Sequence, residues 1–398
     1  TRIESSAASD VYKRQNIIWA PLENGIKSIS LSANWMWPCG NEGEDSRLYK
    51  AVNACSKFAI ELGINIPTGK DSLSMVQKYD NIKIKSPGTV IISASGHCQD
   101  IRKVVKPVLN KKIGDLYYID LSFDKLRLGG SSFAQTQNKI GNDAPTIRNS
   151  VKFRDAFNLV QDLIKSNKIK SGHDISSGGM ITTLLEMCFS SVNTGMDINL
   201  TELGCSDSTK LFFSENQGLI IQSELNLENN FSKIGVDCHK IGKVNNVGLL
   251  NIKNFEDNFS FNITEYRDIW YSTSKDFDKI QTKSNKGVER FNNYKNQPLN
   301  FIFPDDFHGN VDRDFDKNKI NAAVIREKGS NSEREMAYMM SIAGFNVKDI
   351  HMTDIISGKE NLEDIQLLVA VGGFSNSDVL GSAKGWAGSF IHNPKAKN

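Results

Sequence analysis

Apolar residues recur with strand or helix spacing along most of the chain, and the pattern divides it into three units. In the first unit, residues 25–37 alternate in polarity, which predicts a strand. The next apolar positions share one helical face, so we expect a helix with Asp45 or Ser46 as N-cap and Gly63 at its end. A buried strand is predicted over 88–95, and the unit ends near residue 112.

The second unit begins with a predicted strand over 116–121 and continues through a turn of small residues at 128–132. A helix is expected at about 150–166, and a second helix is expected to follow residues 172–179. Further strands are predicted over 219–222, near 240–252 and over 258–263, followed by a helix from Thr264, its expected N-cap, to about Thr282.

The third unit follows a segment, 284–317, that is rich in Asn, Lys, Asp and Pro and has little periodicity, which is typical of a linker. Strands are expected at 322–325, 347–351 and 367–371, with a helix over 333–343 that Gly344 ends. Alternating strands and helices predict a parallel α/β sheet. The turn at 372–375 follows the last strand, where open α/β sheets place their sites.

Composition narrows the class of protein. A chain of 398 residues predicts two or three domains, and 48 basic against 46 acidic residues favour neither a nucleic-acid nor a membrane partner. The six cysteines are scattered, which is typical of reduced thiols. Since no apolar run approaches a membrane span and no secretion signal is evident, we expect a cytoplasmic protein.

Both ends of the chain differ from the rest. Residues 1–15 have no periodic pattern and resemble translated adapter sequence, so we interpret them as a non-native leader. The chain then stops at Asn398 without a terminating element. We therefore expect a fragment of a longer protein.

The stretch 172–179 has the most distinctive chemistry, with three glycines, two serines, His173 and Asp174 ahead of a predicted helix. Glycines and a free helix N-terminus suit a phosphate group. A carboxylate beside a phosphate requires a divalent cation between them, which predicts a metal–nucleotide site. The alternative is a glycine-rich turn in which Ser176 or Ser177 is the helix N-cap.

Two other segments are weaker candidates. Lys70, Asp71 and Ser72 follow Gly69 in a stretch similar to a phosphate loop, but the complete phosphate-loop pattern is absent and a capped turn is the alternative. The turn at 128–132 could equally serve tight packing of a helix on a strand. His173 beside Asp174 is typical of an acid–base pair, although neighbouring loop residues usually point apart.

In this order, the motifs closely resemble the phosphoribosylformylglycinamidine synthase family in its large, single-chain form. The matching segments are 30–38, 43–45, 67–75, 86–89, 128–130, 172–179 and 213–216. The resemblance implies an α/β and α+β multidomain chain with synthetase-superfamily A and B domains and the start of a class I, flavodoxin-like glutaminase domain. It implies the end of the second A domain at 16–112, the second B domain at 113–283, the linker at 284–317 and the glutaminase start at 318–398.

The same resemblance implies an ATP- and glutamine-dependent ligase of purine synthesis. Its small-molecule substrates would be formylglycinamide ribonucleotide, ATP and glutamine. ATP phosphorylates the formamide oxygen, and ammonia from glutamine displaces phosphate from the iminophosphate. Mg²⁺ would be the cofactor, because it offsets charge on the transferring phosphoryl group.

The resemblance also implies roles for individual residues. Asp174 and Asn16 match the family's magnesium ligands, and Ser176 matches its ATP contact. A glutamate is expected four residues before Asn16, but Tyr12 stands there, which we attribute to the leader. The segment 70–72 matches a loop near the active site.

In the glutaminase part, residues 325–331 and 372–378 match the family's first strand and a turn near the oxyanion side. Asn376 and Ser377 depart from the Tyr and Gly common there. The resemblance places no catalytic Cys, His or Glu before Asn398. We therefore expect no glutamine hydrolysis by this chain, and we expect the missing parts of its own polypeptide to be its partners.

Two alternatives remain open at this point. The chain could belong to another ATP-dependent member of the aminoimidazole ribonucleotide synthetase superfamily. It could also be a nucleotide-binding half whose role is structural.

Overall fold

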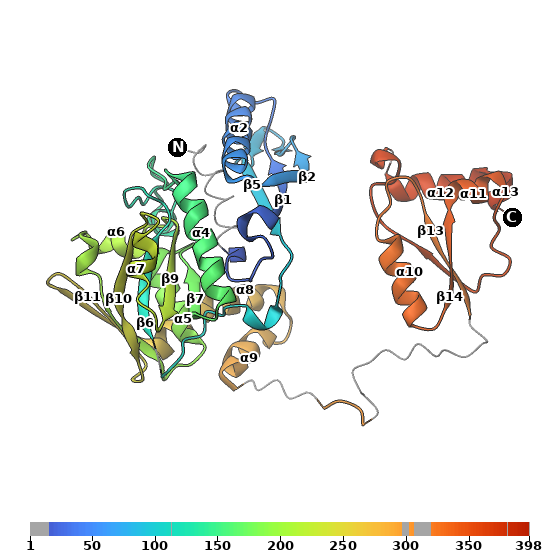
Figure 1. Cartoon of the computed structure of the whole chain (residues 1–398). Helices are drawn as coiled ribbons and strands as arrows, with labels where there is room; N and C mark the ends of the chain where they lie inside the picture. Colours follow the sequence, from blue (N-terminus) through green and yellow to red (C-terminus); the bar gives the residue numbers. More distant parts are fainter. Residues whose placement is uncertain (1–15, 113, 297–301, 306–319, 380, 398) are drawn as a thin grey trace. The chain divides into compact units, whose positions relative to one another are not determined.

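A computed structural model describes residues 16–112, 114–296, 302–305, 320–379 and 381–397. The chain forms two compact units that meet in sequence at residues 296 and 297, and each is described by itself (Figure 1). In the part of the chain that the structure describes, no helix is long and apolar enough to cross a membrane.

The first unit begins with a short helical turn at residues 16–17 and a mixed three-stranded sheet in the order β2-β1-β5. Strand β1 (Ser30–Met36) pairs parallel with β2 (Asn65–Ser72) and antiparallel with β5 (Thr89–Ser95). Single-turn 3-10 helices at η1 (Gly25–Ser28) and η2 (Ile101–Lys103) flank the sheet in sequence. The sheet is mixed because β5 returns antiparallel to β1.

Helix α2 (Glu44–Leu62) lies where the apolar spacing predicts it. Its buried positions are Ala51, Cys55, Ala59 and Leu62, which recur at helical spacing. Gly63 ends the helix in the left-handed conformation, as predicted. The expected N-cap is wrong, because the cap is Gly43 and Asp45 lies in the first turn.

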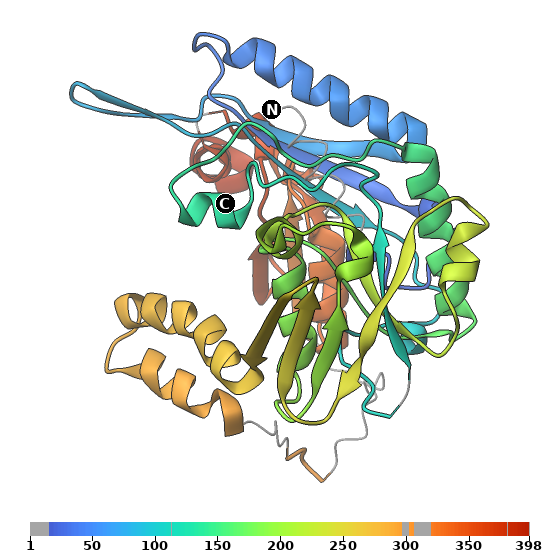
Figure 2. The same cartoon turned by 90° about the vertical axis from the view of Figure 1, so that its left-hand side faces the viewer.

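The sequence pattern missed a two-stranded hairpin, β3 (Val76–Tyr79) and β4 (Ile82–Lys85). It projects from the sheet as a thin arm (Figure 2). Ile82 and Ile84 alternate with Lys83 and Lys85 in β4, but the residues of the hairpin are largely exposed, so it adds no buried face to the core.

A seven-stranded sheet forms the rest of this unit, in the order β12-β11-β8-β10-β6-β9-β7. It is antiparallel except for the pair of β8 with β11. The strands are β6 (Asp115–Asp120), β7 (Ile169–Asp174), β8 (Gly195–Asn199), β9 (Gly218–Ser223), β10 (Cys238–Asn245), β11 (Leu249–Asn254) and β12 (Asp257–Asn262).

Two helices cover opposite faces of this sheet at its β6, β9 and β7 end. Helix α4 (Ser150–Lys165) packs on the core that receives Leu219 and Ile221 of β9, and α5 (Gly179–Phe189) packs on the core that receives Ile220. Because strands buried on both faces are apolar throughout, β9 shows no alternation. The first core also holds residues of the β2-β1-β5 sheet, so α4 lies between the two sheets.

Shorter helices complete the first unit. They are α3 (Ser132–Thr136), η3 (Thr201–Leu203), α6 (Ser208–Phe213) and α7 (Glu228–Ser232). Helix α8 (Ile263–Gln281) begins two residues earlier than predicted, because Asn262 rather than Thr264 is its N-cap.

The first part of the predicted linker folds instead of connecting. Helix α9 (Lys286–Asn293) and the turn η4 (Tyr294–Asn296) lie against α8. Tyr294 stacks on Tyr271 with ring centroids 4.0 Å apart, and Lys295 forms an ion pair with Asp268 at 2.6 Å. A polar segment thus makes a tertiary contact that its composition did not predict. Most of the remaining linker lies outside the described residues.

The second unit has a parallel sheet in the order β14-β13-β15, which confirms the α/β prediction for this part. Its strands are β13 (Asn321–Arg326), β14 (Asn346–His351) and β15 (Leu367–Ala370). Its helices are α10 (Glu333–Ile342), α11 (Met352–Ser357), η5 (Ser375–Asp378), α12 (Ser382–His392) and α13 (Pro394–Lys397). Alternate residues of β13 enter two separate cores, so helices cover both faces of the sheet.

Candidate functional site

The stretch 172–179 spans the end of a strand, a turn and the start of a helix. Gly172, His173 and Asp174 belong to β7, and α5 begins at Gly179. The turn is tight, because Gly178 and Gly179 both have positive φ and a Cβ on Gly179 would lie 2.4 Å from the Phe212 carbonyl oxygen. Gly178, which has no side chain, is the N-cap of α5, so the interpretation of Ser176 or Ser177 as the cap is wrong.

Asp174 lies at the carboxyl end of β7 and is 5% exposed. Its Oδ1 accepts a hydrogen bond from the Trp19 indole Nε1 at 3.0 Å and lies 3.8 Å from His173 Nδ1. Burial raises the pKa of the Asp174 carboxyl, but His173 and Trp19 outweigh that effect and the net pKa is lowered. Asp174 is therefore a buried carboxylate that stays ionised.

His173 pairs with carboxylates on both sides. Its Nε2 lies 3.1 Å from Glu186 Oε2 on α5, and Glu186 Oε1 accepts from Trp270 Nε1 at 3.1 Å. Burial would lower the pKa of His173, but Asp174 and Glu186 outweigh it and raise the pKa to about 9. A charged imidazolium accepts no proton near neutral pH, so His173 is not a general base, and its two carboxylate partners favour a structural role.

Asn16 begins the short turn that carries Trp19. Its side chain is exposed, whereas Trp19 is buried against β7. Gly172 makes room for that indole, since a Cβ at 172 would lie 2.1 Å from the Trp19 ring. The structure thus brings the segment of Asn16 to Asp174 through Trp19, while Tyr12 lies outside the described residues.

Within the described ranges, no group of three or more His, Cys, Asp or Glu side chains is arranged to hold a metal ion. Asp174 and Asn16 would supply two oxygen-bearing side chains at most. That number suits Mg²⁺, which is commonly held by one or two protein oxygens together with substrate phosphates.

Glu215 joins three of the sequence motifs in one place. Its Oε1 accepts hydrogen bonds from the backbone N–H of Gly178 at 2.9 Å and of Ser132 at 2.7 Å. One carboxylate therefore holds the turn before α5 beside the small-residue turn before α3. The sequence signal was the segment 213–216, to which residue spacing alone assigned no role.

The neighbouring residues Ser214 and Asn216 fix the approach to α3. Asn216 Oδ1 accepts from the Arg127 N–H at 3.1 Å and from Ser214 Oγ at 2.6 Å, and its Nδ2 donates to Ser122 Oγ at 3.0 Å. Both side chains are buried. The turn at 128–132 is therefore anchored at both ends.

Lys70, Asp71 and Ser72 lie on the edge strand β2, opposite residues 34–36 of β1. Lys70 Nζ donates to Ser72 Oγ at 2.9 Å in an exposed position. None of the hydrogen bonds or ion pairs among the described residues joins this segment to Asp174, so the structure does not unite these two candidates.

In the second unit, the turns after β13 and β15 pack together. Asn331 N–H donates to the Gly372 carbonyl at 2.9 Å, and Asn376 N–H donates to the Lys328 carbonyl at 2.8 Å. Gly373 has φ +126°, and a Cβ there would lie 2.7 Å from the Gly329 carbonyl oxygen. Asn376 and Ser377 also have positive φ, so the backbone of this turn is sharply bent.

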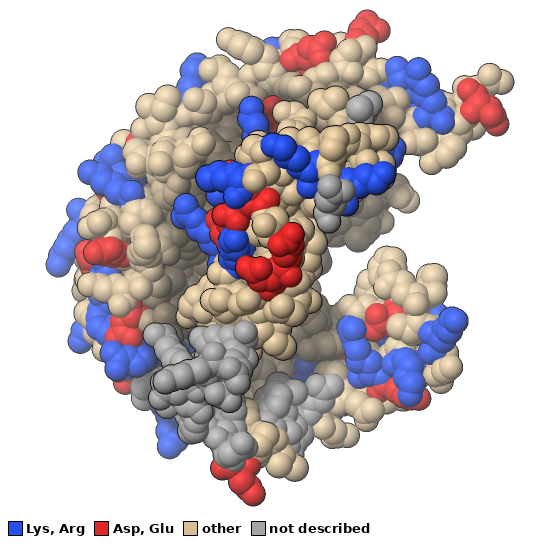
Figure 3. Space-filling view, turned by 90° about the vertical axis from the view of Figure 1, so that its right-hand side faces the viewer, with Lys and Arg blue, Asp and Glu red and all other residues tan. Residues whose placement is uncertain are grey.

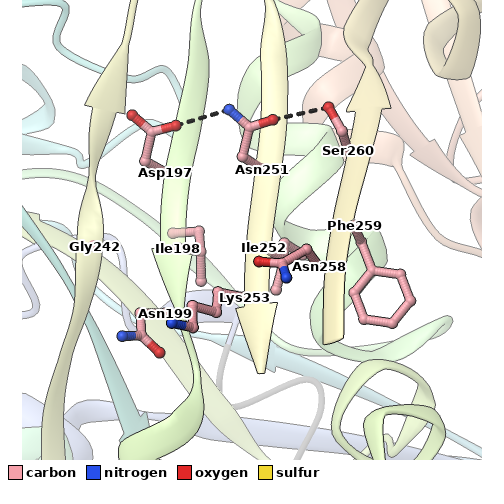
Figure 4. A pocket seen from close by; sticks show the side chains of 10 residues that line it. All are labelled: Asp197, Ile198, Asn199, Gly242, Asn251, Ile252, Lys253, Asn258, Phe259 and Ser260. Carbon is pink, nitrogen blue, oxygen red and sulfur yellow. Dashed lines mark hydrogen bonds between the residues drawn. The ribbon is translucent and has the colours of Figure 1, made fainter. Parts of the chain in front are cut away.

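A hollow of about 510 Å³ lies on the outer face of the seven-stranded sheet, away from these motifs (Figure 4). Its polar side chains bond to one another: Asn251 Nδ2 donates to Asp197 Oδ1 at 2.9 Å, and Ser260 Oγ donates to Asn251 Oδ1 at 2.8 Å. On the face drawn in Figure 3, basic and acidic side chains are interspersed. Neither feature competes with the Asp174 region as a site.

Three protein-family profiles match the chain. The FGAR-AT PurM_N-like domain matches residues 10–97, the AIR synthase related protein C-terminal domain matches 116–253, and the CobB/CobQ-like glutamine amidotransferase domain matches 319–398.

Two curated relatives align with nearly the whole chain. The probable chloroplastic/mitochondrial phosphoribosylformylglycinamidine synthase of Arabidopsis thaliana is 39% identical over 395 residues, which cover 95% of this chain and 27% of the relative. The probable phosphoribosylformylglycinamidine synthase of Caenorhabditis elegans is 35% identical over 398 residues, which cover 94% and 30%. The chain thus spans less than a third of the length of either relative.

The structure of T. maritima PurL complexed with FGAR is similar in fold. It superposes with a TM-score of 0.50 at 10% sequence identity, over 66% of this chain and 43% of that chain. The likeness supports a synthetase-type α/β fold for the first unit.

Proposed function

The chain belongs to the phosphoribosylformylglycinamidine synthase family, and from this premise we propose that it is part of a glutamine-dependent ligase. The ligase converts formylglycinamide ribonucleotide to formylglycinamidine ribonucleotide with ATP. ATP makes the formamide oxygen a leaving group by phosphorylating it, and ammonia from glutamine replaces that oxygen. An amide oxygen leaves poorly without such activation, so the requirement for ATP is chemically reasonable.

The observation that carries this proposal is the buried, ionised Asp174 beside the glycine turn of α5. Gly178 and Gly179 let a phosphate approach the backbone closely, and the N-terminus of α5 favours negative charge. Glu215 holds this turn in place through Gly178. We propose that nucleotide phosphates bind at this turn, with Ser176 in contact.

We propose that Asp174 and Asn16 hold Mg²⁺ between the carboxylate and the phosphates. Bound Mg²⁺ would offset the charge of the phosphoryl group. Asp174 suits this role because its lowered pKa keeps it ionised and Trp19 fixes its orientation. Lys70, Asp71 and Ser72 remain candidates for an active-site strand.

For the second unit, we propose that the turns after β13 and β15 contribute to glutamine binding. The match to a glutamine amidotransferase domain over 319–398 supports this, as does the bent backbone at Gly373. Calorimetric titration of glutamine into the whole chain tests this proposal, and the absence of any heat of binding would contradict it.

We further propose a cytoplasmic location. The structure pairs none of Cys39, Cys98, Cys188, Cys205 and Cys238 in a disulfide, which is typical of a reducing compartment.

Equilibrium dialysis of ATP, with and without Mg²⁺, tests the nucleotide site. We expect Mg²⁺ to tighten ATP binding, and Asp174→Ala to reduce that gain by more than about tenfold, since even partners of metal ligands carry about 10–100-fold in metal affinity. Asp197→Ala is a control for the loss of one carboxylate, because Asp197 lies on β8 at a distance of four strands. If Asp174→Ala leaves the Mg²⁺-dependent affinity intact, the proposed site is wrong.

A further inference from the structure

One face of α4 carries polar side chains that bind backbone atoms of a distant segment. Asn158 Oδ1 accepts from the Ile26 N–H at 3.2 Å, and Lys165 Nζ donates to the Glu23 carbonyl at 3.3 Å. Gln161 lies between them, and this spacing of three and four residues places all three side chains on one helical face. The segment that follows Asn16 is therefore docked on α4 through its backbone.

Gln161 makes the most complete of these contacts. Its Nε2 donates to the Ile18 carbonyl at 2.6 Å, and its Oε1 accepts from the Leu22 N–H at 2.7 Å. The side chain is 1% exposed, and Ile18 and Leu22 are fully buried. Both ends of one rigid amide thus close a turn of five residues, which fixes where that turn lies on the helix.

The same turn carries Trp19, which donates to the Asp174 carboxylate at 3.0 Å. The indole ring also lies over Gly172 on β7, where a side chain would leave it no room. Gln161 and Trp19 therefore hold the turn at two points, one on α4 and one on β7. Asn16 lies two residues before Ile18, the first residue of the turn that Gln161 holds.

We infer that Gln161 is a positioning residue that, with Trp19, fixes Asn16 relative to Asp174 for binding of a Mg²⁺–nucleotide complex. The inference rests on the proposed function. Its physical basis is that Asn16 and Asp174 come from segments more than 150 residues apart, so their separation depends on the contacts that join those segments. Trp19 makes such a contact directly, through its hydrogen bond to Asp174, and Gln161 holds the same turn on α4. The backbone adds a further contact, because Val105 N–H donates to the Trp19 carbonyl at 2.9 Å and the neighbouring Lys106 carbonyl accepts from Gly172 N–H at 3.2 Å.

The test compares Gln161→Leu with Gln222→Leu in the whole chain. Gln222 is a matched control, because it is also fully buried and clamps a backbone through both amide ends, with Asn110 N–H at 2.8 Å and the Asn110 carbonyl at 2.9 Å. Three quantities are measured: the Mg²⁺ concentration at half-maximal ATP binding, the ATP affinity without Mg²⁺, and hydrogen exchange at the Leu22 amide.

We expect Gln161→Leu to raise the Mg²⁺ midpoint about tenfold, as loss of a positioning partner of a metal ligand does, while ATP affinity without Mg²⁺ changes less than about twofold. Exchange at the Leu22 amide should accelerate. Gln222→Leu should change none of these quantities. An unchanged midpoint in Gln161→Leu, or an equal shift in both variants, overturns the inference.

If Gln161→Leu does not fold, Trp19→Phe decides the question by the same criteria, because it keeps a ring beside Gly172 and removes the N–H donor to Asp174. Asp174→Ala separates the two proposals. If it has no effect on the Mg²⁺ midpoint, the proposed function fails. If it abolishes the Mg²⁺ dependence while the positioning variants behave as wild type, the inference about Gln161 fails alone.

Discussion

Two buried glutamines of the first unit should respond in opposite directions to the same substitution. Gln161 bonds at both amide ends, whereas Gln217 is fully buried and neither its Nε2 nor its Oε1 has a hydrogen-bond partner among the described residues. Gln217 directly precedes β9, and the Leu219 side chain of that strand enters the core against which α4 packs. Replacing each glutamine with leucine keeps a similar volume and deletes the amide.

The expected magnitudes follow from what each substitution leaves behind. Gln161→Leu strands the Leu22 N–H and the Ile18 carbonyl, and a buried backbone group without a partner costs about 1–3 kcal/mol. After the gain from a more apolar side chain, we expect unfolding free energy to fall by about 3 kcal/mol. Gln217→Leu removes an amide whose unpaired burial costs about 1–3 kcal/mol, so stability should rise by about 1–2 kcal/mol.

Urea unfolding followed by tryptophan fluorescence measures both effects. Trp386 is the single tryptophan of the second unit, so a Trp386→Phe background reports on the first unit alone. The melting temperature should move about 2–4 °C for each kcal/mol in a unit of this size. If Gln217→Leu lowers stability, the Gln217 amide has a partner and the reasoning from buried unpaired groups is refuted.

Three further predictions concern the strand β7 and the second unit. The ion pairs of His173 stabilise the fold fully below its unfolded pKa of about 6.5, and this stabilisation is lost as pH rises through its folded pKa of about 9. The free energy of unfolding should therefore fall by up to about 3 kcal/mol between pH 6 and pH 10, and a His173→Gln chain should lack this fall. An equal pH dependence in both chains would contradict this prediction. Gly172→Ala should destabilise by about 1–3 kcal/mol through its clash with Trp19, and a double-mutant cycle with Trp19→Leu should recover part of that loss; strict additivity would exclude the clash. Gly373→Ala should cost more than about 1 kcal/mol in unfolding of the second unit, monitored at Trp386, because of its positive φ and the nearby Gly329 carbonyl; unchanged stability would show that the turn relaxes.

Helix positions were predictable where one face is apolar and a glycine ends the helix, as in α2 with Gly63. The strand directions in the first unit could not be predicted from the sequence. The strand β9 is buried on both faces, and apolar strands of this kind are equally typical of parallel sheets. The hairpin β3–β4 and the helix α9 were missed because each is short and largely exposed, although Ile82 and Ile84 alternate with lysines in β4.

The candidate site shows the same division. Glycines before α5 and the acidic Asp174 could be recognised in the sequence, because their chemistry is local. The contacts of Asp174 with Trp19, and of Glu215 with Gly178 and Ser132, join segments 37 to 155 residues apart. Spacing along the chain holds no signal for such contacts, so only the folded structure could identify Trp19 and Glu215 as neighbours of the site.

Crystals of the chain soaked with ATP and Mn²⁺ in place of Mg²⁺ test the central claim most directly, since anomalous scattering locates the cation itself. We expect an anomalous peak about 2.1 Å from an oxygen of Asp174, next to the nucleotide phosphates and in reach of the Asn16 side chain. An ordered nucleotide at the turn before α5 with no cation at Asp174, or a cation held elsewhere in the chain, would contradict the account.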